Sequence, residues 1–188
     1  MISGVVGTGA LALVESEFAF LIDEYAFALA QTSDVPVGLW YRSPRGAVVV
    51  RYDPLGDAAL DVGLEEPGGA AYSIGDVLSP SVRDAERRLD VRELPAFSAE
   101  IDRLKRLLVV HCDDFLRGDL PAFRSRFREA LLVRSCRNLA NEEILRGDVR
   151  RGIKLLESYR SYWTEADKEL HACALEGTGS LTYLRAAG

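Results

Sequence analysis

Residues 37–64, VGLWYRSPRGAVVVRYDPLGDAALDVGL, carry the clearest structural signal in the chain. Two short connections, Ser43-Pro44-Arg45-Gly46 and Asp53-Pro54-Leu55-Gly56, separate three runs rich in apolar residues. Each connection has Ser or Asp first, proline second and glycine fourth, which is the preference of a type I β-turn. Two such turns between three short runs predict a three-stranded antiparallel meander.

The side chains of these runs alternate between an apolar face and a mixed face. Trp40, Arg42 and Arg51 fall on the mixed face. An aromatic ring with arginines on an open sheet face is typical of a protein-contact patch. Alternatively, C-terminal helices cover this face and the three residues have no binding role. The sequence thus makes Trp40, Arg42 and Arg51 candidate binding residues.

Periodic apolar residues predict helices on both sides of the meander. The spacing i, i+3, i+4, i+7 predicts a helix over residues 15–30, preceded by an apolar and loosely packed leader at 1–13. A short helix is expected from Ser81 to about Leu94, where Pro95 ends it. From Ser98 onward the chain is expected to be helical.

The C-terminal helices have two irregular patterns. The apolar stripe of the helix that starts after Asp119 stops near Leu132. Either the helix breaks there or it is covered on two sides, and we favour a kink or break. The last helix, after Asp148, carries an apolar seam with 4-3 spacing from Gly152 to Cys173. Thr164-Glu-Ala-Asp167 resembles a capping box inside this seam. Because the seam continues without a change of phase, we interpret the box as fortuitous and the helix as continuous.

The segments DDFLRGD and EEILRGD end at Asp119 and Asp148. Glycine closes helices in the left-handed conformation, and aspartate caps the next helix, so Gly118, Asp119, Gly147 and Asp148 are predicted structural caps. Arg-Gly-Asp is also an adhesion signal, but that use requires an exposed loop of a secreted protein, and no signal peptide is visible. Duplication of a helical hairpin is a further alternative to convergent capping signals.

Composition limits the possible functions. The chain has 188 residues and a net charge of −6, which argues against general affinity for nucleic acid or an anionic membrane. Residues 1–100 carry 16 acidic and 7 basic residues (net −9), whereas residues 101–188 carry 13 acidic and 16 basic residues (net +3). Attraction to a cationic partner is therefore expected in the N-terminal half. Arg124, Arg126 and Arg128 are expected to lie on solvated flanks or to pair with this acidic half.

No motif predicts catalysis, a metal or a cofactor. The three cysteines are widely spaced, and with two histidines they do not form a zinc-binding pattern. Free thiols suit a reducing cytoplasm, and the N-terminus does not have the length of a membrane span. Cys112 is expected in the core, where its neighbour His111 points elsewhere and cannot easily activate it.

The segments FLIDEYAF, 37–64, YSIGDVL and FLRGDLPAF, taken in this order, resemble a class of small cytosolic bacterial proteins. Several members resemble immunity proteins of polymorphic toxin or contact-dependent systems, which bind and neutralise a cognate toxin. The resemblance spans about residues 18–130 as an order of elements. It implies a non-enzymatic binding role.

The sequence therefore predicts an α+β protein, with an N-terminal helix and three-stranded antiparallel meander packed on a C-terminal helical bundle. An α+β subdomain at 1–95 and a helical subdomain at 96–188 are expected to pack as one unit. The expected function is that of a bacterial cytosolic protein-binding protein, an immunity or defence component with no cofactor, no nucleic acid and no membrane partner. The alternative is an enzyme or small-ligand sensor with a pocket between sheet and bundle.

Overall fold

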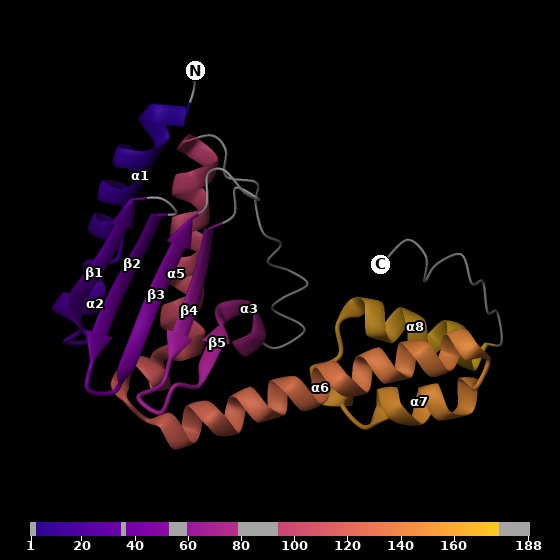
Figure 1. Cartoon of the computed structure of the whole chain (residues 1–188). Helices are drawn as coiled ribbons and strands as arrows, with labels where there is room; N and C mark the ends of the chain where they lie inside the picture. The colour runs from indigo at the N-terminus through magenta and orange to yellow at the C-terminus, as the bar shows by residue number, and fades with distance from the viewer. Residues whose placement is uncertain (1–2, 35–36, 53–59, 79–93, 177–188) are drawn as a thin grey trace. The chain divides into compact units, whose positions relative to one another are not determined.

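The computed structural model describes residues 3–34, 37–52, 60–78 and 94–176. The protein is α+β and divides into two compact units (Figure 1). Unit 1 comprises Met1–Val77 and Arg87–Arg126, and unit 2 comprises Leu78–Glu86 and Phe127–Gly188. Unit 1 contains the whole sheet, and unit 2 is helical where it is described.

The sheet is an antiparallel meander of five strands, not the three that were predicted. Its order follows the chain: β1 (Ala28–Asp34), β2 (Val37–Ser43), β3 (Gly46–Tyr52), β4 (Leu60–Glu65) and β5 (Ala71–Ser73). The predicted runs are β2, β3 and β4, and Pro44 and Arg45 form the turn between β2 and β3. The second predicted turn, Asp53–Gly56, lies outside the described residues.

The helix predicted over residues 15–30 is wrong. Helix α1 (Ser3–Glu17) occupies most of the expected leader, α2 (Phe20–Asp23) is a single turn, and β1 follows. Between α2 and β1 the chain reverses at Ala26, which has a φ of 56°. The apolar residues that suggested one helix therefore belong to the single turn α2, to the turns on either side of it and to the edge strand β1.

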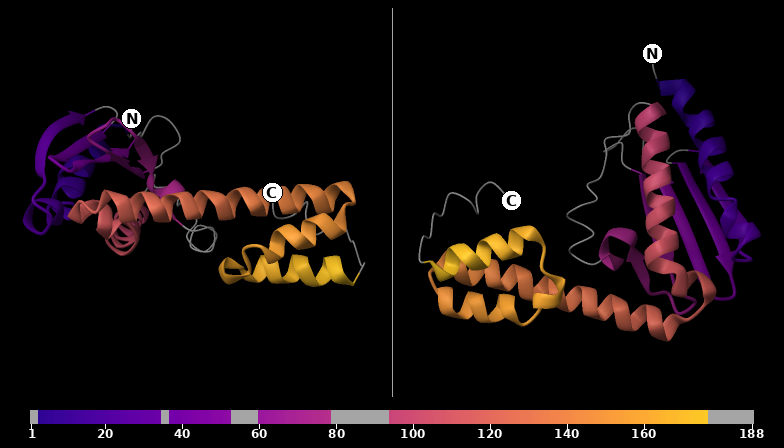
Figure 2. Two further views of the ribbon diagram at one scale, coloured as in Figure 1. Left: turned by 90° about the horizontal axis from the view of Figure 1, so that it is seen from below. Right: turned by 180° about the vertical axis from the view of Figure 1, so that it is seen from behind.

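Helices α1 and α5 (Leu94–Arg117) lie against the same face of the sheet, as Figures 1 and 2 show from opposite sides. Helix α5 begins at Leu94, so Pro95 stands in its first turn. The short helix predicted from Ser81 to about Leu94 lies, except for Leu94, outside the described residues. The core is made of buried side chains from both layers: Phe18, Leu39, Tyr41, Val48, Val50, Leu64, Leu104, Leu108 and Phe115.

Helix α6 (Leu120–Arg146) is continuous, so the predicted break near Leu132 is wrong. Phe123 is buried in unit 1, where its ring lies 5.1 Å from that of Phe115. Val133 and Ala140 instead belong to the core of unit 2. The apolar stripe shifts because the helix changes its packing partners along its length.

Unit 2 contains the rest of α6, α7 (Val149–Glu157), the 3-10 turn η1 (Arg160–Tyr162) and α8 (Glu165–Leu175). The prediction of one continuous helix after Asp148 is wrong. The capping box is real: Thr164 Oγ1 accepts a hydrogen bond from Asp167 N, and Asp167 Oδ2 accepts one from Thr164 N at 2.8 Å. Trp163 also donates from Nε1 to Leu156 O at 2.8 Å, which stabilises the return of the chain.

The two LRGD segments each close one helix and open the next. Gly118 and Gly147 have φ values of 87° and 93°. Asp119 Oδ1 accepts a hydrogen bond from Ala122 N, and Asp148 Oδ1 accepts one from Arg151 N, both at 3.1 Å. These aspartates therefore satisfy amide groups that have no partner inside the helices.

Replacing each glycine by alanine tests the surroundings of the two caps. A Cβ at Gly147 would meet no atom within 4 Å, whereas a Cβ at Gly118 would lie 2.4 Å from Arg45 Cδ. We expect Gly147→Ala to lower the free energy of unfolding by about 1 kcal/mol through backbone strain alone. Gly118→Ala should cost more, because Arg45 must also move. Chemical denaturation of both variants measures the difference, and equal losses would contradict the packing role of Gly118.

Tyr41 offers a second test of the core. Its hydroxyl is buried and, among the described residues, has no hydrogen-bond partner. Burial raises the pKa of this phenol above its usual value. We expect Tyr41→Phe to raise the free energy of unfolding by up to about 1 kcal/mol, because an unpaired buried polar group is removed. Tyr72→Phe is the matched control and should be destabilising, since Tyr72 donates to Glu66 Oε1 at 2.7 Å.

Candidate protein-contact surface

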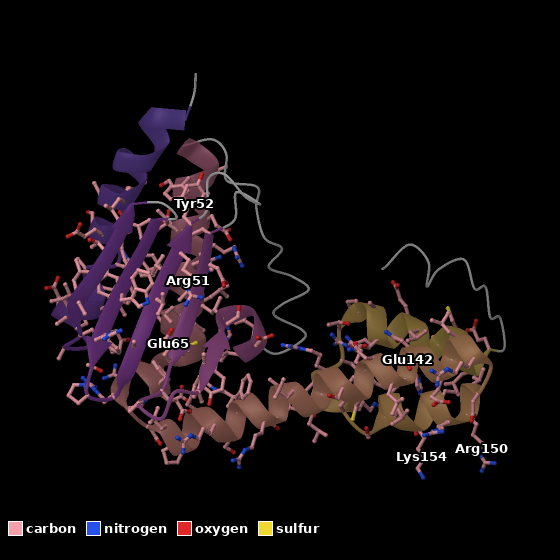
Figure 3. The ribbon with its side chains drawn as sticks, viewed as in Figure 1. Arg51, Tyr52, Glu65, Glu142, Arg150 and Lys154 are labelled. Atoms are coloured by element: carbon pink, nitrogen blue, oxygen red, sulfur yellow. The ribbon has the colours of Figure 1, made fainter. Side chains whose placement is uncertain are left out.

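The sheet face turned away from α1 and α5 carries the three predicted binding residues. In the β2–β3 ladder Gly38 pairs with Arg51, Trp40 with Val49 and Arg42 with Ala47. Because side chains alternate along each strand, all six positions share this face. We call it the outer sheet face; Figure 3 labels Arg51 and Glu65 on it.

Trp40 lies at the centre of the outer sheet face. Its ring extends over Gly38, where an added Cβ would lie 2.6 Å from ring atom Cζ3. Val49, directly across from Trp40, is fully buried although it points away from the helices. Trp40 itself is half-buried. The indole thus lies flat enough to cover the sheet and still presents part of its surface to solvent.

Arg51 is bound within the same face. Its guanidinium lies 3.6 Å from the carboxylate of Glu65 on β4, and both side chains are partly exposed. In the β3–β4 ladder, Glu65 stands opposite Ala47 and Gly63 stands opposite Val49. Gly63 lies between Asp61 and Glu65 on this face and has no side chain to separate Arg51 from Glu65. Arg51 therefore has a local counter-charge, which reduces its availability for a partner.

Arg42 differs from Arg51. Its side chain is exposed, and no ion pair of Arg42 is found within the part of the chain that the structure describes. Arg124, by contrast, pairs with Glu66 of the acidic half, and Arg126 pairs with Asp114 on α5. Among the described residues, Arg42 is thus an exposed positive charge without an ion pair on the same face as Trp40.

Sequence reasoning missed Glu65 and Ser73 as members of this face. The period of two along β4 places Glu65 with Asp61 and Gly63, so alternation alone could have found it. Ser73, whose hydroxyl donates to Asp61 Oδ1 at 3.4 Å, stands on β5. A strand of three residues is too short for a periodic signal, and Ser73 had none.

Two buried carboxylates elsewhere have their hydrogen-bonding capacity used structurally. Glu66 accepts from Arg124 Nε at 3.0 Å and from the hydroxyl of Tyr72. These bonds, that from Arg124 above all, hold the pKa of Glu66 below its usual value. In unit 2, Asp167 accepts from Arg137 and from Thr164. Each carboxylate orients neighbouring chain segments, which leaves little capacity to act as a catalytic base.

Other potentially reactive groups lie among the described residues. Burial raises the pKa of the Cys112 thiol to about 12, so it does not form the nucleophilic thiolate at neutral pH. Within residues 3–34, 37–52, 60–78 and 94–176, His, Cys, Asp and Glu do not gather in groups of three or more that could hold a metal ion. Over the same residues, no helix has the length and apolarity needed to cross a bilayer.

Comparisons with protein-family models, with curated proteins and with solved structures found no match.

The Glu66 cluster predicts a pH-dependent stability. Because the folded-state pKa of Glu66 is lowered, its stabilisation is full above the unfolded pKa of about 4.3 and is lost as pH falls through the folded value. We expect Glu66→Gln to lower the free energy of unfolding at pH 7 by about 1–2 kcal/mol. Near pH 2.5, denaturation experiments should show a smaller difference in the free energy of unfolding between Glu66→Gln and the unmodified protein. Glu65→Gln, at a partly exposed ion pair, is the control and should change stability by less than about 0.5 kcal/mol.

Proposed function

We propose that this chain is a protein-binding protein that contacts its partner through Trp40, Arg42 and Arg51 on the outer sheet face. One observation carries the proposal: a half-buried indole lies beside Arg42, an exposed arginine without a counter-charge among the described residues. Trp and Arg are the residue types most enriched among energetically dominant interface contacts. The rigid sheet beneath them holds both side chains with little entropic cost on binding.

Charge supports a partner with two features. The net charge of −9 over residues 1–100 attracts a basic protein at long range. At the contact itself, Arg42 fits a carboxylate that approaches the edge of the Trp40 ring. The acidic residues of 1–100 act at long range and Arg42 acts at the contact, so a basic partner with an acidic group at the contact is compatible with both charges.

The biological role that we propose is neutralisation of a cognate protein in the bacterial cytoplasm, as in immunity proteins. Its support is the resemblance in the order of elements across residues 18–130 and a contact surface formed by a rigid sheet. Neutralisation by occlusion requires a surface that binds firmly and no catalytic group. The structural use of Glu66 and Asp167 is consistent with this requirement.

A capture experiment with matched variants tests the contact surface. Tagged chains carrying Arg42→Glu, Trp40→Ala or, as control, Lys154→Glu are expressed in the native cell and purified with quantitative mass spectrometry. Lys154 is exposed on α7 in unit 2 (Figure 3). We expect a specific partner whose recovery falls at least about tenfold for the two sheet variants but not for the control.

Two results would overturn the proposal: no partner enriched over an unrelated tagged protein, or a partner retained equally by all variants. Arg42→Glu is the decisive variant because the Arg42 side chain is exposed, so this substitution disturbs the folding of the protein least. Circular dichroism of each purified variant separates loss of binding from loss of structure.

A further inference from the structure

Helix α6 carries exposed leucines about 100° around the helix from the residues that it buries in the core of unit 2. Leu132 is 64% exposed and Leu139 is 37% exposed, whereas Val133 and Ala140 are buried. At about 100° per residue, Arg128, Leu132 and Leu139 fall within about 40° of one another around the helix. We call this set, together with Ser135 and Glu142 beside it, the α6 outer stripe. Exposed apolar side chains aligned on one helix face mark an interaction surface.

The α6 outer stripe is complementary to itself when reversed. A two-fold axis that passes beside the stripe, perpendicular to the helix and level with the midpoint between Leu132 and Leu139, brings Leu132 of one copy opposite Leu139 of the other. The same axis places Arg128, four residues before Leu132, beside the acidic turn three to four residues after Leu139. That turn contains Glu142, whose side chain is 56% exposed. Leucine thus meets leucine, and arginine meets glutamate, twice by symmetry.

The remaining details of the stripe suit close approach of two helices. Ser135 lies near the midpoint between the two leucines, and its small side chain allows the helix backbones to come near each other. Arg128 has no ion pair within the described part of the chain. Glu142 pairs with Arg146 at 3.1 Å, but both side chains are mostly exposed, so this bond yields readily to a new partner.

From this self-complementarity we infer that a second copy of the chain docks antiparallel on the α6 outer stripe. The contact involves two leucines and two charged groups per copy. Its buried area is therefore below the roughly 1,200 Å² of a stable interface, and the dimer is a transient one that forms at micromolar or higher concentration. The stripe lies in unit 2, whereas the outer sheet face lies in unit 1, so this inference stands independently of the proposed function.

Sedimentation equilibrium of the full-length protein up to about 200 μM tests the dimer. We expect a monomer–dimer equilibrium whose dissociation constant rises at least about tenfold in Leu132→Asp and in Leu139→Asp. Leu145→Asp is the matched control: Leu145 is 47% exposed on the same helix but lies off the stripe. A protein that stays monomeric throughout, or a dimer lost equally in the control, would contradict the inference.

A charge-exchange experiment tests the antiparallel orientation. Arg128→Glu alone and Glu142→Arg alone each place like charges together in the homodimer and should weaken it. When the two variants are mixed in equal amounts, each contact pairs opposite charges, and a heterodimer should form with affinity close to that of the unmodified protein. A mixture that associates no better than the separate variants would show that the stripe meets another surface. The helix content of each variant is checked by circular dichroism.

Discussion

The guanidinium of Arg45 connects three chain segments on which the arrangement of unit 1 depends. From the turn between β2 and β3, it donates to Leu116 O at 3.2 Å and to Tyr25 O at 2.6 Å, and its side chain packs on Gly118. Leu116 O is among the last carbonyls of α5, which have no partner within the helix, and a cation there also complements the helix dipole. One side chain thereby ties the hairpin to the end of α5 and to the turn between α2 and β1. Helix α5 is held against one sheet face, and Trp40 and Arg42 lie on the other face.

The same contact separates two segments that are nearly identical in sequence. Gly118 and Gly147 have the same backbone conformation, and each is followed by a capping aspartate. Only Gly118 lies against another segment of the fold, since the space around Gly147 is open. Local signals encode the cap, which is why the spacing of LRGD was enough to place it. The contact with Arg45 is non-local, and no property of the seven residues distinguishes the segment that makes it.

Prediction from the sequence succeeded where the chemistry is local. Proline and glycine at fixed turn positions placed the hairpin between β2 and β3, and alternation along these strands placed Trp40, Arg42 and Arg51 on one face. Prediction failed where one sequence pattern was compatible with two different structures. The apolar residues between Phe18 and Leu29 have helical spacing, but the chain reverses at Ala26, whose left-handed φ has no sequence signal in alanine. At Thr164, the periodic apolar seam favoured a continuous helix over the capping box. The box nevertheless satisfies specific backbone amide groups, whereas an apolar seam specifies only which residues can pack on a neighbouring element.

The two proposed contact surfaces differ in how their charges are paired. On the outer sheet face, Arg51 pairs with Glu65, whereas Arg42 has no ion pair among the described residues, so the proposed partner contributes an acidic group there. On the α6 outer stripe, Arg128 and Glu142 lie at opposite ends of the pair Leu132 and Leu139. A reversed copy therefore places each charged group beside one of opposite sign. A second copy on α6 would present a second sheet face, and a partner with two binding epitopes would then gain affinity through effective concentration without a new contact. In that case a substitution at Leu132 would weaken capture of such a partner while leaving the intrinsic affinity of each sheet face unchanged.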